Sequence, residues 1–164
     1  MHETSMNTMR KFVKDYLSRG VETKIIDIGS LDINGSYKQL FDDDQWEYTG
    51  VDIIEGKNVD LILKDLYLLP YEDNSIDIVI SGQAFEHMEY PWLMMGQIHR
   101  VLKTGGLCCI IVPGSGPIHE RPDCWRILPD GMIGMAKLSG LTIVELGLSP
   151  VSWNDVTLIS KKDN

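Results

Sequence analysis

The sequence has few features that mark disulfide-bonded, secreted or membrane-spanning proteins. Only three cysteines occur in 164 residues: Cys108 and Cys109 are adjacent, and Cys124 stands alone. This spacing provides neither a disulfide framework nor the paired ligands of a zinc site, so we expect reduced thiols and no metal. No apolar run approaches the roughly 20 residues that cross a bilayer, and residues 1–20 are charged throughout, unlike a secretory signal. We therefore expect a cytoplasmic protein.

Basic residues are also scarce. The chain has 15 Lys and Arg against 24 Asp and Glu, which gives a formal net charge of -9. Proteins that bind nucleic acids or anionic membranes without sequence preference depend on clustered Lys and Arg. We therefore expect neither a nucleic acid nor a membrane as partner.

What is abundant is apolar sequence in short segments. The length and the 43% hydrophobic content predict one domain over residues 1–164, with a covering helix within residues 1–20. Ile- and Val-rich runs alternate with helical segments, which is typical of a doubly wound α/β fold: about seven strands in a parallel sheet with helices on both faces. The predicted strands are residues 24–28, 47–52, 59–63, 76–81, 107–112, 141–148 and 156–160, and the predicted helices are residues 4–19, 35–41, 92–102 and 129–139.

Ligands of such sheets bind outside the carboxyl ends of the strands. Gly29 follows the first strand and allows a tight turn, and Gly35 permits close approach as the next helix begins. Asp27 and Asp32 flank this turn, and two carboxylates suit a cationic amino-acid or sulfonium group better than a pyrophosphate. Because only two glycines of the G-x-G-x-x-G pattern are present, a nicotinamide-dependent oxidoreductase is the less favoured enzyme class.

Two further strand ends carry acids. Asp52 ends the second strand, where an acid accepts hydrogen bonds from both hydroxyls of a ribose; the alternative is a solvated loop acid. Asp65 could accept from an adenine amino group while Leu66 covers the ring, although this pair could also belong to an ordinary capped turn.

Taken in order, these segments resemble the class I S-adenosylmethionine-dependent methyltransferases of small-molecule type. The resemblance covers about residues 24–112 and is carried by residues 25–30, 50–52, 65–70, 75–79 and 100–106. It implies S-adenosyl-L-methionine as cofactor and a reversed, antiparallel final hairpin. The cofactor-binding residues expected on this basis are Asp27, Gly29, Ser30, Asp32, Asp52, Ile53, Asp65, Leu66, Ser81 and Gly82. Leu31 departs from the pattern, because it stands where the second glycine usually lies.

The fourth strand is followed by the pair Glu86 and His87, which faces the expected methyl-transfer position. An imidazole with a pKa near 6.5 is an available base at neutral pH, so His87 is a candidate catalytic residue. The alternative is a histidine that only caps or packs the following helix.

A long connection follows Val112 and carries the densest mixture of reactive side chains in the chain. We expect His119 to serve as a catalytic base, and Asp123, Trp125 and Arg126 to bind the acceptor. The alternative is that Arg126 pairs with Asp123 or Asp130 to fasten the loop, with Trp125 buried beneath it.

The sequence thus predicts an enzyme that transfers a methyl group from S-adenosylmethionine to a small-molecule acceptor, such as a hydroxyl of a sugar or another metabolite. A non-catalytic cofactor-binding or scaffold module is the alternative from a different class, because fold does not settle function. With no inserted lid domain, the site is either open or completed by a second copy of the chain in a homodimer.

Overall fold

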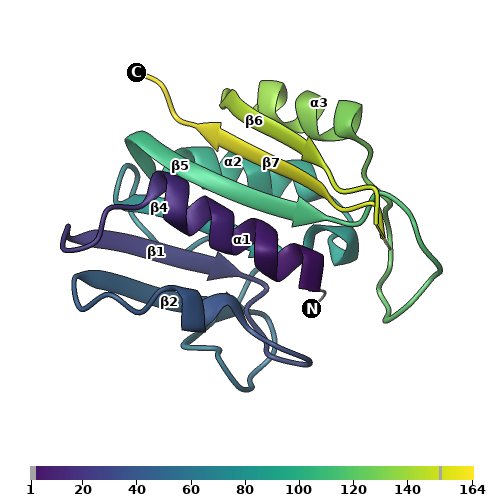
Figure 1. Ribbon diagram of the computed structural model, residues 1–164, viewed down its shortest axis with the longest axis horizontal. Coiled ribbons are helices and arrows are strands. Elements are labelled where there is room, and N and C mark those ends of the chain that lie inside the picture. The colour runs from purple at the N-terminus through teal and green to yellow at the C-terminus, as the bar shows by residue number, and fades with distance from the viewer. Residues whose placement is uncertain (1–2, 152) are drawn as a thin grey trace.

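The computed structural model describes residues 3–151 and 153–164 and contains one seven-stranded sheet (Figure 1). The strands are β1 (Thr23–Ile28), β2 (Trp46–Asp52), β3 (Leu61–Ile62), β4 (Ile76–Gly82), β5 (Leu102–Val112), β6 (Thr142–Leu148) and β7 (Val156–Lys161). Their order is β3-β2-β1-β4-β5-β7-β6, with β1 to β5 parallel and β7 antiparallel to both β5 and β6. The predicted α/β fold with an antiparallel final hairpin is confirmed.

Helices cover both faces of the sheet. They are α1 (Glu3–Tyr16), α2 (Pro91–Val101) and α3 (Pro129–Ser139), together with the short 3-10 helices η1 (Tyr37–Leu40) and η2 (Phe85–His87). On one face, α1 buries Met9 and Phe12 against β1, β4 and β5. On the other face, α2 and α3 pack side by side, and Met94, Ile98 and Met132 are fully buried there. Each face therefore has its own apolar layer; Figure 1 shows α1 on one face and α2 and α3 on the other.

Two predicted helices differ from the observed ones. The helix predicted at residues 35–41 is only the 3-10 turn η1, because Gly35 has a φ of +126° and the acidic run that begins at Asp42 leaves too few residues for an α-helix. The helix predicted to stop at Gly105 ends at Val101 instead. Gly105 belongs to β5, where it adopts a φ of +83° and donates its N–H to the Lys162 carbonyl.

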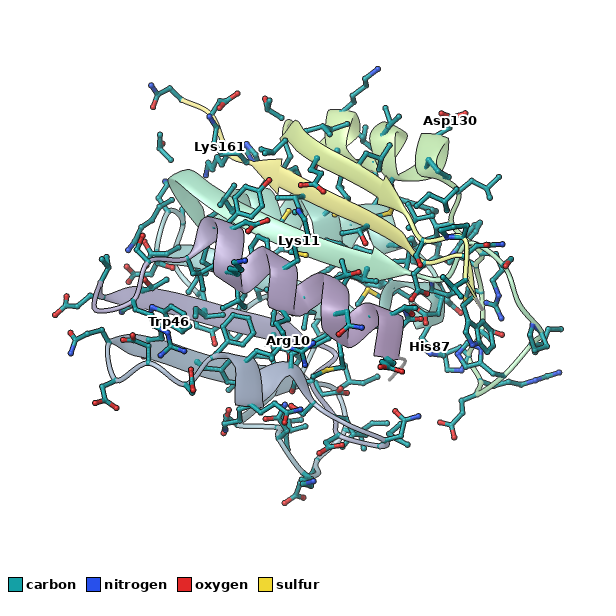
Figure 2. All side chains as sticks on the ribbon, viewed as in Figure 1. Arg10, Lys11, Trp46, His87, Asp130 and Lys161 are labelled. Atoms are coloured by element: carbon teal, nitrogen blue, oxygen red, sulfur yellow. The ribbon has the colours of Figure 1, made fainter. Side chains whose placement is uncertain are left out.

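The strand order reverses between β1 and β4, and the connections that follow these two strands meet at the carboxyl edge of the sheet. Figure 2 shows His87 at this edge, beside the projecting loop of residues 113–128, whereas Trp46 lies towards the opposite edge. Among the described residues, no helix combines the length and apolar character needed to cross a membrane.

Candidate functional site

The turn after β1 is held tightly against its neighbours. The N–H groups of Gly29 and Ser30 both donate to the Val51 carbonyl of β2. Gly29 has a φ of +75°, and a Cβ at this position would lie 2.3 Å from the Cβ of Ala84, which follows β4. Only glycine meets both conditions, so the turn predicted from Gly29 forms where the connections from β1 and β4 come closest.

Asp27 is a buried carboxyl group beside this turn. It is 3% exposed, and the Tyr48 hydroxyl donates to its Oδ2 at 2.5 Å. The Asn58 amide in turn donates to the Tyr48 oxygen and to the Ser30 carbonyl. Burial raises the pKa of Asp27 to about 7, and the nearby Asp52 carboxylate adds to the rise. A cation bound next to Asp27 would stabilise the ionised form of its carboxyl group.

Asp52 lies at the end of β2 with its carboxylate oriented by backbone amides. Leu31 N–H donates to Oδ2 at 3.2 Å, and the N–H groups of Ile53 and Ile54 donate to Oδ1 at 2.7 and 3.2 Å. Because a carboxylate offers about four lone-pair positions and three are used here, about one remains available to a hydroxyl of a ligand.

Two adjoining hollows open at this edge. The smaller, of about 90 Å³, is lined by Asp27, Ser30, Tyr37 and Gly82 among others. The larger, of about 230 Å³, has Asp52, Ile53, Leu66 and His87 in its wall. They share four lining residues, Gly29, Leu31, Ile33 and Gln83. The hollows therefore form one elongated concavity over the β1 and β4 ends.

Three of the predicted cofactor-binding residues lie outside the two linings. The Asp32 carboxylate contacts Lys57 Nζ and the Gly35 N–H, both at 2.7 Å, and so closes the turn. Asp65 accepts from the Tyr67 N–H at 2.8 Å, which is the capped turn considered as its alternative. Ser81 is fully buried and donates to the Ile28 carbonyl, so it joins β4 to β1.

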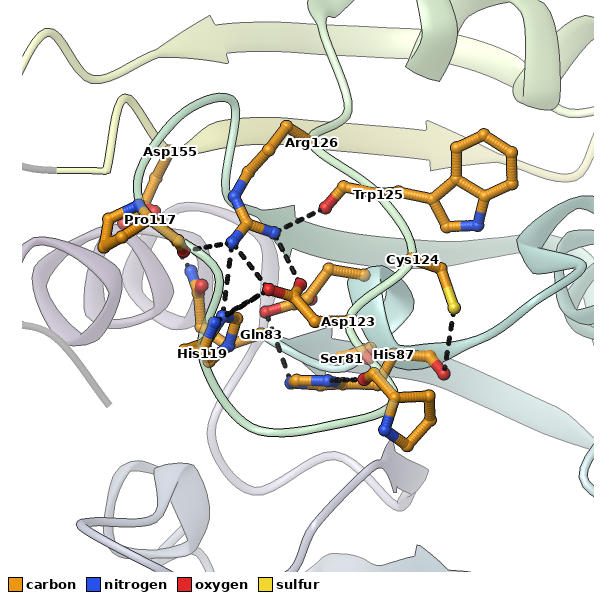
Figure 3. A network of polar contacts seen from close by, with 12 residues as sticks. Ser81, Gln83, His87, Pro117, His119, Asp123, Cys124, Trp125, Arg126 and Asp155 are labelled. Atoms are coloured by element: carbon orange, nitrogen blue, oxygen red, sulfur yellow. Dashed lines mark hydrogen bonds and ion pairs between the residues drawn. The ribbon is translucent and has the colours of Figure 1, made fainter.

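The candidate catalytic histidines lie together although they come from separate segments. The rings of His87 in η2 and His119 in the loop have centroids 4.9 Å apart, beside the Asp123 and Arg126 pair (Figure 3). His87 Nε2 lies 3.8 Å from the buried Glu86 carboxylate, and burial raises the pKa of Glu86 to about 8. The fold thus assembles two imidazoles and one carboxyl group next to the larger hollow.

Arg126 and Asp123 fasten the loop internally. The guanidinium binds both Asp123 oxygens, at 2.6 and 2.9 Å, and donates to the carbonyls of Gly116, Pro117 and Trp125. The Asp123 carboxylate is 2% exposed, and Arg126 holds its pKa well below the usual range. These bonds engage the whole guanidinium fork, so the fastening role is the one the geometry favours for this pair over a direct grip on the acceptor.

Trp125 combines a fixed indole with a partly exposed ring. Its Nε1 donates to the Met88 carbonyl at 2.9 Å, its ring meets Trp92 edge to face at 6.0 Å, and the residue is 40% exposed. The ring is therefore not buried beneath the loop, and it remains able to stack on a flat ligand.

Gln83, Tyr37 and Tyr48 are potential site residues that the sequence did not indicate. Gln83 follows β4 with a φ of +59°, donates from Nε2 to Asp155 and lines both hollows. Its position after a strand could have suggested it. The two tyrosines act through tertiary contacts that no local spacing predicts.

The family model described as methyltransferase domain matches residues 26–110. A 2-methyl-6-phytyl-1,4-hydroquinone methyltransferase of Oryza sativa subsp. japonica is 32% identical over 87 residues, which cover 49% of this chain and 23% of the relative. The 27-O-demethylrifamycin SV methyltransferase of Amycolatopsis mediterranei is 29% identical over 99 residues, covering 57% and 36%. The match thus spans only 23% and 36% of the length of these two relatives.

Solved structures show the same fold. The 1,6-didemethyltoxoflavin-N1-methyltransferase of Burkholderia thailandensis superposes with a TM-score of 0.78 at 15% identity, over 99% of this chain and 80% of that one. Its structure contains 1,6-didemethyltoxoflavin and S-adenosylhomocysteine.

Proposed function

The chain belongs to the methyltransferase domain family of class I S-adenosylmethionine-dependent methyltransferases, and we propose that it transfers a methyl group from S-adenosylmethionine to a hydroxyl group of a small molecule. The observation that carries this proposal is the buried Asp27 carboxyl beside the smaller hollow. A buried carboxyl group without a cation is costly to ionise, whereas an α-ammonium or sulfonium group would stabilise its charged form.

The residues present fit the cofactor that the family implies. Asp27 and the Gly29 turn would hold the methionine end, because Asp27, Gly29 and Gly82 line the smaller hollow together. Asp52 would accept from the ribose hydroxyls, and Leu66 and Ile53 would cover the adenosine end. The bound cofactor supplies an electrophilic methyl group on sulfur.

The remaining work for the protein is alignment, exclusion of water and handling of the acceptor's proton. His87 lines the larger hollow, and the His119 ring packs against the His87 ring, so we place both imidazoles on the acceptor side. The half-exposed Trp125 provides a flat apolar surface nearby for the body of the acceptor.

The names of the relatives support a small acceptor. Both curated relatives are named for methylation of small organic molecules, a hydroquinone and a rifamycin. The acidic composition is consistent with this class, since a nucleic acid acceptor would be repelled.

The test is to incubate the protein with methyl-labelled S-adenosylmethionine and a cell extract, and then to separate small molecules from protein, nucleic acid and lipid. We expect the label in the small-molecule fraction. Replacement of His119 by Gln should slow labelling of a hydroxyl acceptor by about a hundredfold or more, but should change the rate little for an amine that arrives neutral. Label recovered only in protein or nucleic acid would contradict the proposal.

A further inference from the structure

Three ligand-type side chains converge where η2 meets the loop after β5. One donor atom from each of Glu86, His87 and His119 lies within 4.8 Å of the other two. The backbone keeps the segments together, because the N–H groups of Cys124 and Trp125 both donate to the Glu86 carbonyl. The cluster therefore lies where the loop returns to η2, and Figure 3 shows two of its members, His87 and His119.

The Glu86 carboxyl group is the feature that needs an explanation. Glu86 is 0% exposed, and neither of its oxygens has a hydrogen-bond partner among residues 3–151 and 153–164. Buried polar atoms are nearly always paired, and a buried carboxylate without a partner is strongly disfavoured. A cation bound beside it would supply the missing partner.

Both histidines are oriented as metal ligands usually are. His87 Nδ1 lies 2.5 Å from the Pro122 carbonyl oxygen, and His119 Nδ1 lies 3.1 Å from Asp123 Oδ2. The Pro122 carbonyl oxygen only accepts, so His87 Nδ1 carries the hydrogen and its Nε2 keeps the lone pair. His119 Nδ1 also lies 3.3 Å from the Arg126 guanidinium, which only donates, so the shorter contact with Asp123 is the one that would leave His119 Nε2 free for a metal. A histidine fixed in this way by a carbonyl or carboxylate is the usual outer-shell arrangement of a metal site.

We propose that Glu86, His87 and His119 bind one divalent transition-metal ion of the zinc, cobalt or iron type. Two imidazoles with one carboxylate favour such ions over Mg²⁺ and Ca²⁺, which prefer oxygen ligands. Three protein ligands also leave coordination positions open, as in catalytic metal sites. Since metal–ligand bonds are about 2.0–2.2 Å long, the three side chains would draw together by about 1 Å on binding.

This site differs from the expectation, drawn from the cysteines, that the chain binds no metal. The sequence shows Glu86 and His87 as neighbours, but only the fold brings His119 from the next connection to them. In the sequence alone, His119 cannot be told apart from an ordinary loop histidine.

The chemical role of the ion rests on the proposed function. His87 lines the same hollow as Asp52, so an open coordination position would face the acceptor side. A hydroxyl bound there has a lowered pKa and releases its proton to solvent. Its oxygen then forms the new O–C bond, while the C–S bond breaks and its electron pair stays on the sulfur of the product thioether. The ion would thus take the place of a free imidazole base.

The experiment is a titration of the chelator-treated chain of residues 1–164 with Co²⁺, followed by visible absorption. We expect one Co²⁺ per chain with a d–d spectrum of nitrogen and oxygen ligation. Because second-shell changes alone typically cost 10–100-fold in metal affinity, His119→Gln and Glu86→Gln should each weaken binding by about a hundredfold or more. Glu86→Gln has the size and neutral charge of the protonated carboxyl group that burial favours, and should therefore fold. His99→Gln, a histidine of α2 outside the cluster, is the matched control and should bind as the parent does.

Two results would overturn the metal site: no Co²⁺ binding by the parent protein, or equal binding by the parent and both cluster variants. A parallel titration with S-adenosylhomocysteine separates this inference from the proposed function. Loss of S-adenosylhomocysteine binding with Co²⁺ binding intact would refute the methyltransferase proposal and leave the metal site standing. The reverse pattern would refute the metal site alone.

Discussion

The two sides of the proposed site are built in different ways. The cofactor side is made of strand ends: Asp27 near the end of β1 is fixed by Tyr48, and Asp52 at the end of β2 is fixed by backbone amides. The acceptor side is a loop of residues 113–128 that is held by its own Arg126 and Asp123 pair. The first side takes its rigidity from the sheet, whereas the second depends on a few polar contacts.

This difference indicates which residues are held in place for ligand binding and which for stability. On the cofactor side a buried acid is retained beside a hollow at a cost in stability, which is the signature of a binding site. On the acceptor side, Arg126 and Asp123 pair with each other and so have little capacity left for a ligand. The partly exposed Trp125 ring and the Glu86 carboxyl group, which has no hydrogen-bond partner among the described residues, remain for ligands. Mutations should therefore affect the two sides differently.

The largest expected effect is on the cofactor side, with Asp27→Asn. Because the pKa of Asp27 is raised from 3.8 to about 7, the folded chain holds a proton that the unfolded chain has lost across this interval. Stability from this group is therefore greatest below pH 4, falls as the pH rises to about 7, and stays low above it. At about 1.4 kcal/mol per pH unit the loss approaches about 4 kcal/mol, and the neutral Asn avoids it.

Urea unfolding at pH 5 and pH 8 measures this difference. We expect Asp27→Asn to be more stable than the parent protein, with the larger gain at pH 8, and to bind S-adenosylhomocysteine more weakly. An equal gain at both pH values would show that ionisation of Asp27 is not the cause.

On the acceptor side, Arg126→Ala should destabilise the protein, whereas Asp27→Asn on the cofactor side should stabilise it. This change removes the ion pair and two hydrogen bonds from the Asp123 carboxylate, which keeps only its His119 contacts, and should lower the free energy of unfolding by about 2–3 kcal/mol. It should also open the loop to a glutamate-specific protease at the exposed Glu120. Arg121→Ala, an exposed arginine of the same loop, is the control and should leave both the stability and the cleavage rate unchanged. A loop equally resistant in both variants would contradict the fastening role.

A smaller effect tests how tightly the Gly29 turn of the cofactor side is packed, with Gly20 before β1 as the control. Gly29 and Gly20 have nearly the same backbone conformation, with φ of +75° and +74°. An added Cβ meets Ala84 at 2.3 Å at Gly29, but nothing within 4 Å at Gly20. Both alanine variants share the cost of the left-handed conformation, so Gly29→Ala should be less stable than Gly20→Ala by about 2 kcal/mol, as expected for overpacking. Equal thermal unfolding of the two variants would mean that the turn has room to move.

The sequence predicts most strands and helices well because their bounds depend on neighbouring residues. Apolar runs of strand length and the stop at Gly140 gave β1, β2, β4 and α3 to within a residue or two. The helix predicted at residues 35–41 failed because its apolar residues, Tyr37 and Phe41, serve the α1 side of the sheet from a 3-10 turn. Tertiary packing overrode local periodicity at that point.

The site is predictable only where its residues continue strands. Asp27 lies near the end of β1, Gly29 follows it, and Asp52 ends β2, so their clustering at one edge follows from parallel pairing. The partners of Arg126, the burial of Glu86 and the approach of His119 to His87 depend on the path of a long loop. No spacing in the sequence determines that path.

The central claim is that Asp52 holds the ribose of a cofactor in the hollow over β1 and β4. The most direct measurement is calorimetric titration with S-adenosylhomocysteine of the parent protein, Asp52→Ala and the matched control Asp44→Ala, which changes an exposed acid of the loop before β2. We predict micromolar binding by the parent and the control, and binding weaker by about 10–100-fold for Asp52→Ala, since hydrogen bonds to a charged group contribute about 1.5–3 kcal/mol. Equal affinity in all three proteins, or no binding by the parent, would contradict the account.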